Sequence, residues 1–164
     1  MARLGPASAA GRVIGIYVAA VRGELPAAAP AIAALAGVGL AGDRYATGAG
    51  TWSPWPGTGR EVTLIAAEVL ESLPESCRLD PAEARRNLLT RGVDLDALVG
   101  RDFRIGGARL RGQRPCEPCR HLEALTRPGV AARLRGRGGL RADVLASGLI
   151  HCGDAVEILP PPAP

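Results

Sequence analysis

The chain has 164 residues, of which 47% are hydrophobic and 22% are charged, so it is expected to fold as one domain rather than remain disordered. All 20 basic residues are arginine and the net charge is +4, which favours a small anionic partner, while 3% aromatic residues leave few rings for nucleic acid bases. The apolar run over residues 13–21 is far shorter than the ~20 residues of a membrane-spanning helix, and the first 11 residues do not resemble a secretion signal, so we expect a cytoplasmic protein with no membrane partner.

The first third of the chain is expected to hold one strand and one long loop. Residues 12–21 are rich in β-branched side chains and predict a strand. Residues 26–36 are alanine-rich and interrupted by Pro30, so they form either a short helix or an extended segment. Residues 42–59 contain five glycines and predict a long loop, of the kind that often borders a binding site.

The sequence of the middle of the chain predicts short strands and short helices. Residues 61–65 indicate a strand, and helical spacing follows over residues 66–73. Asp80 and Pro81 are favourable helix-start residues, so a short helix is expected to run to about Arg86. A short strand over residues 88–90 and a helical turn over residues 94–99 complete this region.

The last third predicts a hairpin, two helices and two strands. Residues 103–111 alternate around two glycines, which is typical of a tight hairpin. Helices are expected over residues 117–125 and 128–135, and strands over residues 140–145 and 155–159.

Short strands at irregular spacing, with glycine turns and few helices, predict a mainly β (α+β) fold built as a small barrel. Residues 1–11 are interpreted as a flexible N-terminus, residues 12–159 as the domain and residues 160–164 as a proline-rich tail.

The chemistry is concentrated in a CxxC pair formed by Cys116 and Cys119. Arg114 and Arg120 flank the pair, and a helix is expected to begin beside it, so the pKa of such a thiol is expected to fall toward neutrality. The thiolate form attacks sulfur and binds thiophilic metals, so the pair fits a persulfide carrier or a molybdenum ligand.

Three other interpretations of the pair remain open. Zinc would need two further ligands, which His121, His151 or Cys152 offers, although there is no second CxxC pair. A small zinc-stabilised module that docks an anionic partner through its arginines is therefore the alternative function. A redox dithiol and an inert buried pair are the other two interpretations, while Cys77 is interpreted as structural.

The sequence resembles the MOSC domain family, named for the C-terminal domain of molybdenum cofactor sulfurase, in its stand-alone bacterial type. The resemblance covers most of the chain and follows, in order, residues 39–44, 61–65, 85–90 with Gly92, 116–119, 138–142 and 153–154. It implies a barrel-like β fold and a cysteine that carries sulfur or coordinates molybdenum held by a pyranopterin.

The resemblance also implies the roles of individual residues. It assigns the ligand or carrier thiol to Cys119, with Cys116 as its helper. In relatives that bind the cofactor, an asparagine-bearing segment contacts the pterin and its phosphate, which implies this role for Arg86 and Asn87. An amide can donate and accept hydrogen bonds at a pterin edge, and a guanidinium pairs with phosphate oxygens.

Further cofactor-binding candidates surround this central set. Asp43 and Arg44 form a charged pair where the glycine-rich loop begins, and a plain loop salt bridge is the alternative. Arg114 and Arg120 are expected to join the site. Arg137 and Arg141, which bracket Gly138 and Gly139, form either an anion-binding turn or part of an ordinary hairpin.

The resemblance limits the activity as well as indicating it. The chain contains no lysine, so pyridoxal phosphate cannot be held covalently, and sulfur must come from a separate donor protein. Some relatives reduce N-hydroxylated compounds, which implies a molybdenum-dependent oxidoreductase served by a separate electron-transfer protein.

Overall fold

The computed structural model describes residues 9–51, 53–55 and 57–161. Its strands are β1 (Ala9–Val18), β2 (Ala27–Ala28), β3 (Ala31–Leu35), β4 (Gly39–Leu40), β5 (Val62–Ala66), β6 (Leu88–Arg91), β7 (Asp102–Ile105), β8 (Ala108–Pro115), β9 (Leu140–Ala146), β10 (Gly148–His151) and β11 (Ala155–Ile158). Its helices are α1 (Ala67–Glu71), α2 (Arg120–Leu125) and α3 (Val130–Leu134), with 3-10 turns η1 (Glu75–Cys77) and η2 (Asp96–Leu98). The fold is therefore mainly β, as predicted.

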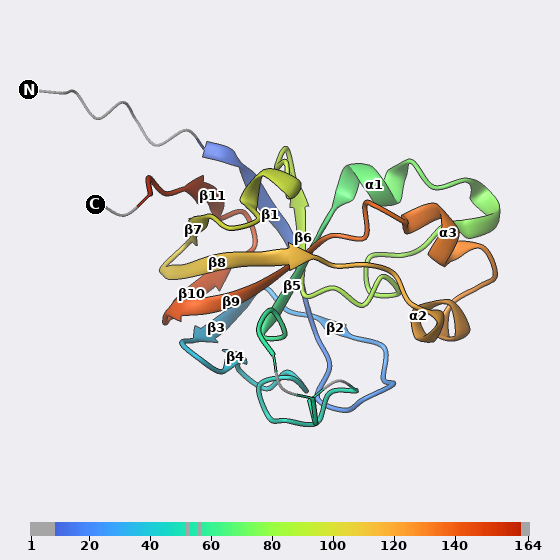
Figure 1. Ribbon diagram of the computed structural model, residues 1–164, viewed down its shortest axis with the longest axis horizontal. Coiled ribbons are helices and arrows are strands. Elements are labelled where there is room, and N and C mark those ends of the chain that lie inside the picture. The colour runs from blue at the N-terminus through green and yellow to red at the C-terminus, as the bar shows by residue number, and fades with distance from the viewer. Residues whose placement is uncertain (1–8, 52, 56, 162–164) are drawn as a thin grey trace, which may run out of the picture.

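Seven strands of the described chain close into a barrel (Figure 1). Their order is β11-β7-β8-β9-β5-β6-β1, and β1 pairs with β11 to complete the circle. All these pairs are antiparallel except β5 with β6. Closure leaves no free edge among the seven strands, which removes a common route to aggregation.

Side-chain alternation explains why these segments form barrel strands. In β9, Leu140, Ala142 and Val144 are buried, while Arg141 and Asp143 between them face outward. Strand β8 has the same period of two, with arginines at the outward positions. Strand geometry sends successive side chains to opposite faces, so each segment contributes one apolar face to the barrel interior.

Two apolar clusters fill the molecule. The first lies inside the barrel and draws buried side chains from most of its strands, among them Ile16, Leu64, Leu88, Phe103, Leu110 and Leu140. The second packs the helices against β5 and β6, and it includes Ile65, Leu70, Leu79, Leu89, Leu122 and Leu134. Figure 1 shows α1, α2 and α3 together on one side of the barrel, and this group is called the helical lobe below.

The predicted elements are largely confirmed, with shifted ends. Strand β1 begins at Ala9, so residues 9–11 belong to the barrel; the rest of the expected flexible N-terminus, residues 1–8, and residues 162–164 of the tail lie outside the described residues. The alanine-rich segment is extended and forms β2 and β3. Residues 42–59 contain no helix or strand in their described part, as a loop requires.

The prediction of a helix from Asp80 to Arg86 is wrong. Residues 81–85 form turns, with only local hydrogen bonds such as that from the Glu83 N–H to the Asp80 carbonyl. The chain cannot continue as a helix because Arg85 takes a positive φ of 57°, the left-handed region.

The helix expected from residue 117 begins only at Arg120. Pro118 disfavours the helical conformation of the residue before it, and Cys119 is extended, with φ of −129° and ψ of 168°. Strands β4 and β10 were not predicted; they pair with β3 in a separate three-stranded sheet. No helix in the described part of the chain has the length and apolar character to span a membrane.

Candidate functional site

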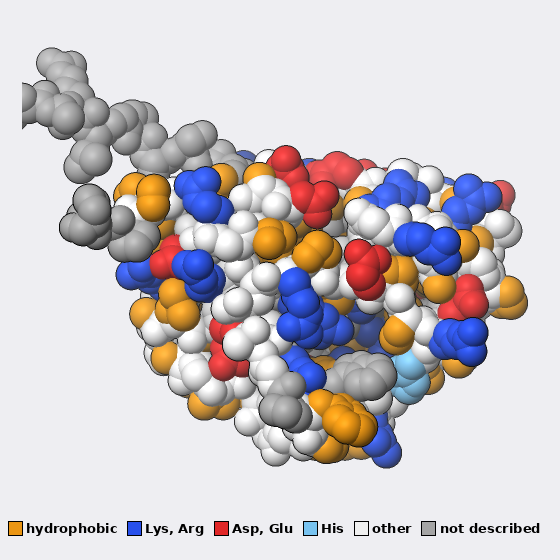
Figure 2. Space-filling model, in the orientation of Figure 1, with side chains coloured by type: hydrophobic (Ala, Val, Ile, Leu, Met, Phe, Trp, Pro, Cys, Tyr) orange, Lys and Arg blue, Asp and Glu red, His pale blue; other side chains and the backbone are white. Residues whose placement is uncertain are grey.

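A cavity of about 140 Å³ opens between the barrel and the helical lobe. It is lined by cationic, polar and thiol side chains from five separate segments: Arg44, Tyr45, Thr51, Thr63, Arg85, Arg86, Asn87, Cys116, Glu117, Cys119, His121, Leu122 and Arg141. Figure 2 shows a hollow in this region with arginine side chains around it. The fold thus brings together chain segments almost 100 residues apart.

Cys119 lies in the wall of this cavity, between β8 and α2. It is half-buried, packs against the apolar cluster of the helical lobe, and is the N-terminal flanking residue of α2. Its sulfur makes no hydrogen bond to any residue that the structure describes. A partly accessible thiol without a protein partner can receive sulfur or bind a metal. Helix α2 has only six residues, so it contributes less dipole than the longer predicted helix would.

Cys116 also faces the cavity, but only 1% of the residue is exposed. Its backbone N–H donates to the Gly139 carbonyl at 2.7 Å, and a β-carbon at position 138 would lie only 2.2 Å from the Cys116 carbonyl oxygen. Only glycine at position 138 allows the two backbones to approach this closely. The glycine pair therefore fixes the CxxC segment against β9, and Cys119 is the more accessible of the two thiols.

Asp43 anchors the start of the glycine-rich loop from inside the protein. It is fully buried, and its carboxylate accepts hydrogen bonds from the backbone N–H groups of Ala19 (3.1 Å) and Tyr45 (3.3 Å). The Arg44 guanidinium lies 3.5 Å from the same carboxylate and 5.1 Å from the centre of the Tyr45 ring. The predicted charged pair exists, but only Arg44 reaches the cavity; Asp43 holds it in position.

Asn87 connects three parts of the fold through its side chain. Its Oδ1 accepts from the backbone N–H of Thr63 at 3.1 Å and from the Thr63 hydroxyl at 3.2 Å. Its Nδ2 donates to the Tyr17 carbonyl at 3.1 Å and to Asp43 at 3.4 Å. Both polar atoms are therefore engaged within the protein, which makes Asn87 a positioning residue in the wall of the cavity.

Arg86 is likewise anchored by the backbone. Its Nε donates to the Gly138 carbonyl at 3.0 Å and a terminal nitrogen donates to the Ala84 carbonyl at 3.3 Å. Only 9% of Arg86 is exposed, yet it lines the cavity, so it contributes a fixed positive charge. Its position at the site agrees with the sequence prediction.

Arg85 was not among the predicted site residues, although it lines the cavity. It is the one non-glycine residue with positive φ in the described part of the chain. Burial, and then the neighbouring guanidinium of Arg44, lower the pKa of Arg85 below its usual value. Nothing in the local sequence marks either the strained backbone or the neighbouring charge, because both depend on the folded structure.

Arg141 points outward from β9 into the same cavity. The guanidinium groups of Arg85 and Arg141 make no hydrogen bond or ion pair to any described residue. They contrast with Arg44 and Arg86, whose guanidinium groups have protein partners. The two unpartnered groups are the ones that remain available to an anion.

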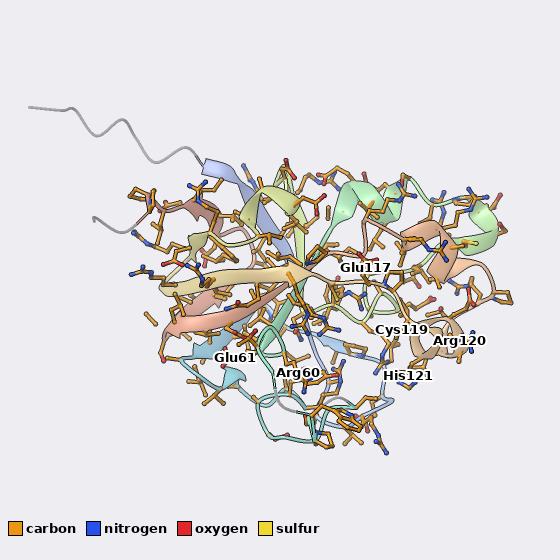
Figure 3. The ribbon with its side chains drawn as sticks, viewed as in Figure 1. Arg60, Glu61, Glu117, Cys119, Arg120 and His121 are labelled. Carbon is orange, nitrogen blue, oxygen red and sulfur yellow. The ribbon has the colours of Figure 1, made fainter. Side chains whose placement is uncertain are left out.

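The two arginines that flank the CxxC pair do not line the cavity. Arg114 is exposed and donates to the Thr58 carbonyl at 2.6 Å. Arg120 is exposed and borders a shallow groove with Glu123 and Arg127 on the outer side of α2, whereas His121 faces the cavity (Figure 3). Spacing along the chain therefore placed these two charges near the thiol without predicting the direction of their side chains.

No group of three or more His, Cys, Asp or Glu side chains in the described residues is arranged to hold a metal. All four cysteines are described, and all are free thiols. Cys77 is buried under the helical lobe and Cys152 is exposed on the barrel, so neither joins the CxxC pair. The described residues therefore offer no set of zinc ligands for the alternative function, a zinc-stabilised module.

These features define a protein with a small closed β barrel, in which one cavity combines a half-buried thiol with four arginine side chains. A family model described as MOSC domain matches residues 56–157, which is more than half of the chain. The protein therefore belongs to the MOSC domain family, which is associated with the molybdenum cofactor.

Solved structures share the fold over almost the whole chain. The YuaD protein from Bacillus subtilis aligns with a TM-score of 0.74 at 20% identity, covering 90% of this chain and 94% of that chain. YiiM from Escherichia coli aligns with a TM-score of 0.64 at 20% identity, covering 93% and 72% of the two chains. No curated protein matches the chain in sequence.

Proposed function

We propose that the protein binds the molybdenum cofactor in the arginine-lined cavity, with Cys119 as the thiolate that ligates molybdenum or carries sulfur to it. One observation supports this most directly. A half-buried thiol that makes no hydrogen bond to a described residue lines the same cavity as four arginines. The MOSC family supplies the identity of the cofactor.

The residues of the cavity fit the chemistry of such a ligand. Arg85 and Arg141 offer unpartnered guanidinium groups to the phosphate, while Arg44 and Arg86 contribute positive charge from anchored positions. Cys119 offers the soft sulfur donor that molybdenum binds, with His121 beside it as a proton donor.

The volume of the cavity indicates how the ligand is held. About 140 Å³ is less than half the lower end of the roughly 300–1,000 Å³ range of sites that enclose a drug-sized molecule. A space of this size would hold only one end of the cofactor, and Arg44, Tyr45 and Thr51 of the 42–59 loop would be among the residues around it. Asp43 and Asn87 serve this arrangement by holding Arg44 and the loop against β1, β5 and β6.

When bound, the cofactor supplies two-electron redox chemistry. The corresponding reaction is reduction of an N-hydroxylated compound, in which R–NHOH takes up two electrons and two protons, the N–O bond breaks, and R–NH₂ and water form. A separate protein must supply the electrons. Among the cavity residues, His121 carries the imidazole, a side chain that can both donate and accept a proton, and would pass protons to the substrate.

The test is the molybdenum and pterin content of protein purified from a host that makes the cofactor. Parent protein and the control Cys152→Ala, which changes an exposed thiol on the barrel, should carry molybdenum and oxidisable pterin in equal amounts. Cys119→Ala should lose most of its molybdenum. Parent protein that carries neither component, or one equivalent of zinc instead, would contradict the proposal.

The sulfur-carrying form of the proposal has its own measurement. The parent protein is incubated with a cysteine desulfurase and cysteine, alkylated, and examined by mass spectrometry for an added sulfur atom. Cys119 should carry the persulfide, and Cys116, at 1% exposure, should carry little. Equal amounts of persulfide on Cys119 and on the exposed Cys152 would show that the cavity does not direct sulfur to Cys119.

A further inference from the structure

The aromatic residues of the chain are concentrated in the loop beside the cavity. Only five of the 164 residues are aromatic, and three of them, Tyr45, Trp52 and Trp55, fall within residues 45–55. Trp52 lies outside the described residues, whereas Trp55 is described and is 62% exposed. An indole ring carries a large apolar surface, so a ring left in water next to a cavity is a candidate for contact with a ligand.

Trp55 and Tyr45 line a second pocket, of about 220 Å³, which is called the loop pocket below. The loop pocket is completed by Gly48, Ser53, Gly57, Arg60 and Glu61. Tyr45 also lines the arginine-lined cavity, so the two spaces meet at this residue. A cavity of roughly 150 Å³ accepts benzene, so the loop pocket has room for a planar ring with a substituent.

The loop holds Tyr45 as a fixed wall of the loop pocket. A β-carbon at position 50 would lie 2.4 Å from the Tyr45 ring, so only glycine there allows the backbone to approach the ring this closely. The N–H of Gly50 donates to the Ser53 hydroxyl at 2.9 Å, and the Arg44 guanidinium lies 5.1 Å from the centre of the Tyr45 ring. Trp55 leaves most of its surface exposed and is therefore the aromatic side chain on which a ligand can stack.

The charge of the loop pocket differs from that of the main cavity. Its described lining has one residue of each sign, Arg60 and Glu61 just before β5 (Figure 3), whereas the main cavity has four arginines. The Oε2 atom of Glu61 accepts a hydrogen bond from the Val144 N–H at 2.6 Å, and its Oε1 atom has no hydrogen-bond partner among the described residues. Burial and the negative charge of Asp143 raise the pKa of Glu61, against the effect of the hydrogen bond from Val144. An N–H donor on a ligand would stabilise the ionised carboxylate, whereas a phosphate would find few cations here.

We propose that the loop pocket binds a planar aromatic group that carries N–H donors, with Trp55 stacked on the ring, Tyr45 as the fixed wall and Glu61 as the hydrogen-bond acceptor. This inference deepens the proposed reductase function. It rests on that function only for the further assignment that the bound ring belongs to the acceptor, whose N-hydroxylated group would enter the main cavity past Tyr45.

The test measures binding of benzamidine to the full-length protein without molybdenum, by titration followed through the NMR signals of the ligand. Acetamidine carries the same amidinium group without the ring, and benzamide carries the ring without the charge. Trp55→Leu and Glu61→Gln alter the loop pocket. Leu149→Ala is the matched control, because Leu149 is 54% exposed on β10 and lines neither pocket.

The parent should bind benzamidine about fivefold or more tightly than acetamidine, because stacking on an aromatic side chain contributes at least this much. Trp55→Leu should lose about fivefold or more of the affinity for benzamidine, and Leu149→Ala should stay within about twofold of the parent. Unchanged benzamidine binding in Trp55→Leu, or equal affinities of the parent for benzamidine and acetamidine, would overturn the proposal.

The role of Glu61 has its own comparison. Glu61→Gln keeps the shape of the side chain and an oxygen for the Val144 N–H, but it removes the negative charge. This variant should weaken the binding of benzamidine, which is a cation, more than the binding of neutral benzamide. Equal weakening of both ligands would overturn the assignment of Glu61 as the acceptor.

Other occupants of the loop pocket are distinguished by the Trp55 variant. Tighter binding of single-stranded RNA than of benzamidine, abolished in Trp55→Leu, would overturn the proposal in favour of nucleic acid. A parent dimer in sedimentation that becomes a monomer in Trp55→Leu would overturn it in favour of a contact between two copies of the chain.

The link to reduction is tested separately on protein that carries molybdenum. The ratio of kcat/KM for phenylhydroxylamine to that for N-methylhydroxylamine should fall about fivefold or more in Trp55→Leu and stay within about twofold in Leu149→Ala. An unchanged ratio in Trp55→Leu would overturn the assignment of the loop pocket to the acceptor. Benzamidine binding that depends on Trp55, in a protein that never carries molybdenum, would support the loop pocket and contradict only the proposed function.

Discussion

Arg85 combines a strained backbone with an unfavourably placed charge. Its φ of 57° is a conformation that costs an L-residue with a β-carbon about 1–2 kcal/mol. Its guanidinium is half-buried near Arg44, and the pKa of Arg85 is lowered as a result. Strain of this kind gathers at ligand sites, and a bound anion between the two guanidinium groups would relieve the repulsion.

The strain leads to a prediction about two substitutions of Arg85. Both Arg85→Ala and Arg85→Gly remove the guanidinium, but only glycine adopts positive φ without a steric penalty. We expect Arg85→Gly to be more stable than Arg85→Ala by about 1 kcal/mol in urea denaturation, the reverse of their order in an ordinary helix. Both variants should retain less pterin than the parent. Equal stability of the two would show that the residue is not strained.

At the level of single residues, sequence reasoning named part of the cavity lining, and the roles of those residues stay predictions. Cys119, Cys116, Arg86, Asn87 and Arg44 line the cavity as the family pattern implied. Arg114 and Arg120 do not, because proximity in sequence says nothing about which way a side chain points. Asp43 turned out to be buried, which depends on its hydrogen bonds to Ala19 and Tyr45.

Among the elements, the β7–β8 hairpin depends on an acidic residue at the start of β7. The carboxylate of Asp102 is 8% exposed and binds Arg109 and Arg111 of β8, the latter at 2.9 Å. Hydrogen bonds from Arg109 and then Arg111 hold the pKa of Asp102 below its usual range, against the opposing effect of burial. Cross-strand pairs of this kind stabilise a hairpin and fix its register.

The lowered pKa of Asp102 sets the sign of a pH effect. The ionised carboxylate contributes stability above its unfolded pKa of about 3.9, and this contribution disappears as the pH falls through the lower folded value. Asp102→Asn should therefore reduce the free energy of unfolding at pH 7 by about 1–3 kcal/mol, with a smaller difference from the parent near pH 2. Chemical denaturation at both pH values measures this. A difference that is constant with pH would show that the charge of Asp102 is unimportant.

The elements that sequence reasoning predicted are those with a clear period. The barrel strands alternate buried and outward residues, as β9 does, and were found within a few residues of their ends. Strands β4 and β10 are two and four residues long, and the pairing of β10 with β3 joins segments more than 100 residues apart, which no local pattern reports. The helix predicted at residues 80–86 rested on favourable start residues, but it does not form, because Arg85 adopts a positive φ.

The whole molecule consists of a closed barrel and a less regular lobe. The barrel strands hydrogen-bond to neighbours on both sides around a continuous apolar interior. The lobe depends on helices of five or six residues, too short to be stable without packing. The cavity lies where the two parts meet, so one wall is rigid and the other rests on short helices.

This difference predicts unequal local stability. In native-state hydrogen exchange, amides of β7, β8 and β9 should exchange through the highest-energy openings, close to global unfolding. Amides of α2 and α3 should exchange through smaller openings at lower free energy, and bound cofactor should slow them more than it slows the barrel. Uniform protection across both parts would contradict the distinction.

The pairing of β1 with β11 also determines where additional protein can be attached. Ala9 lies opposite Glu157 in this pair, so the two ends of the barrel chain emerge side by side. Figure 1 places β1 and β11 on the side of the barrel away from α2. A domain or affinity tag fused at either end would therefore leave from the same pole of the molecule, with the mouth of the cavity still open to solution.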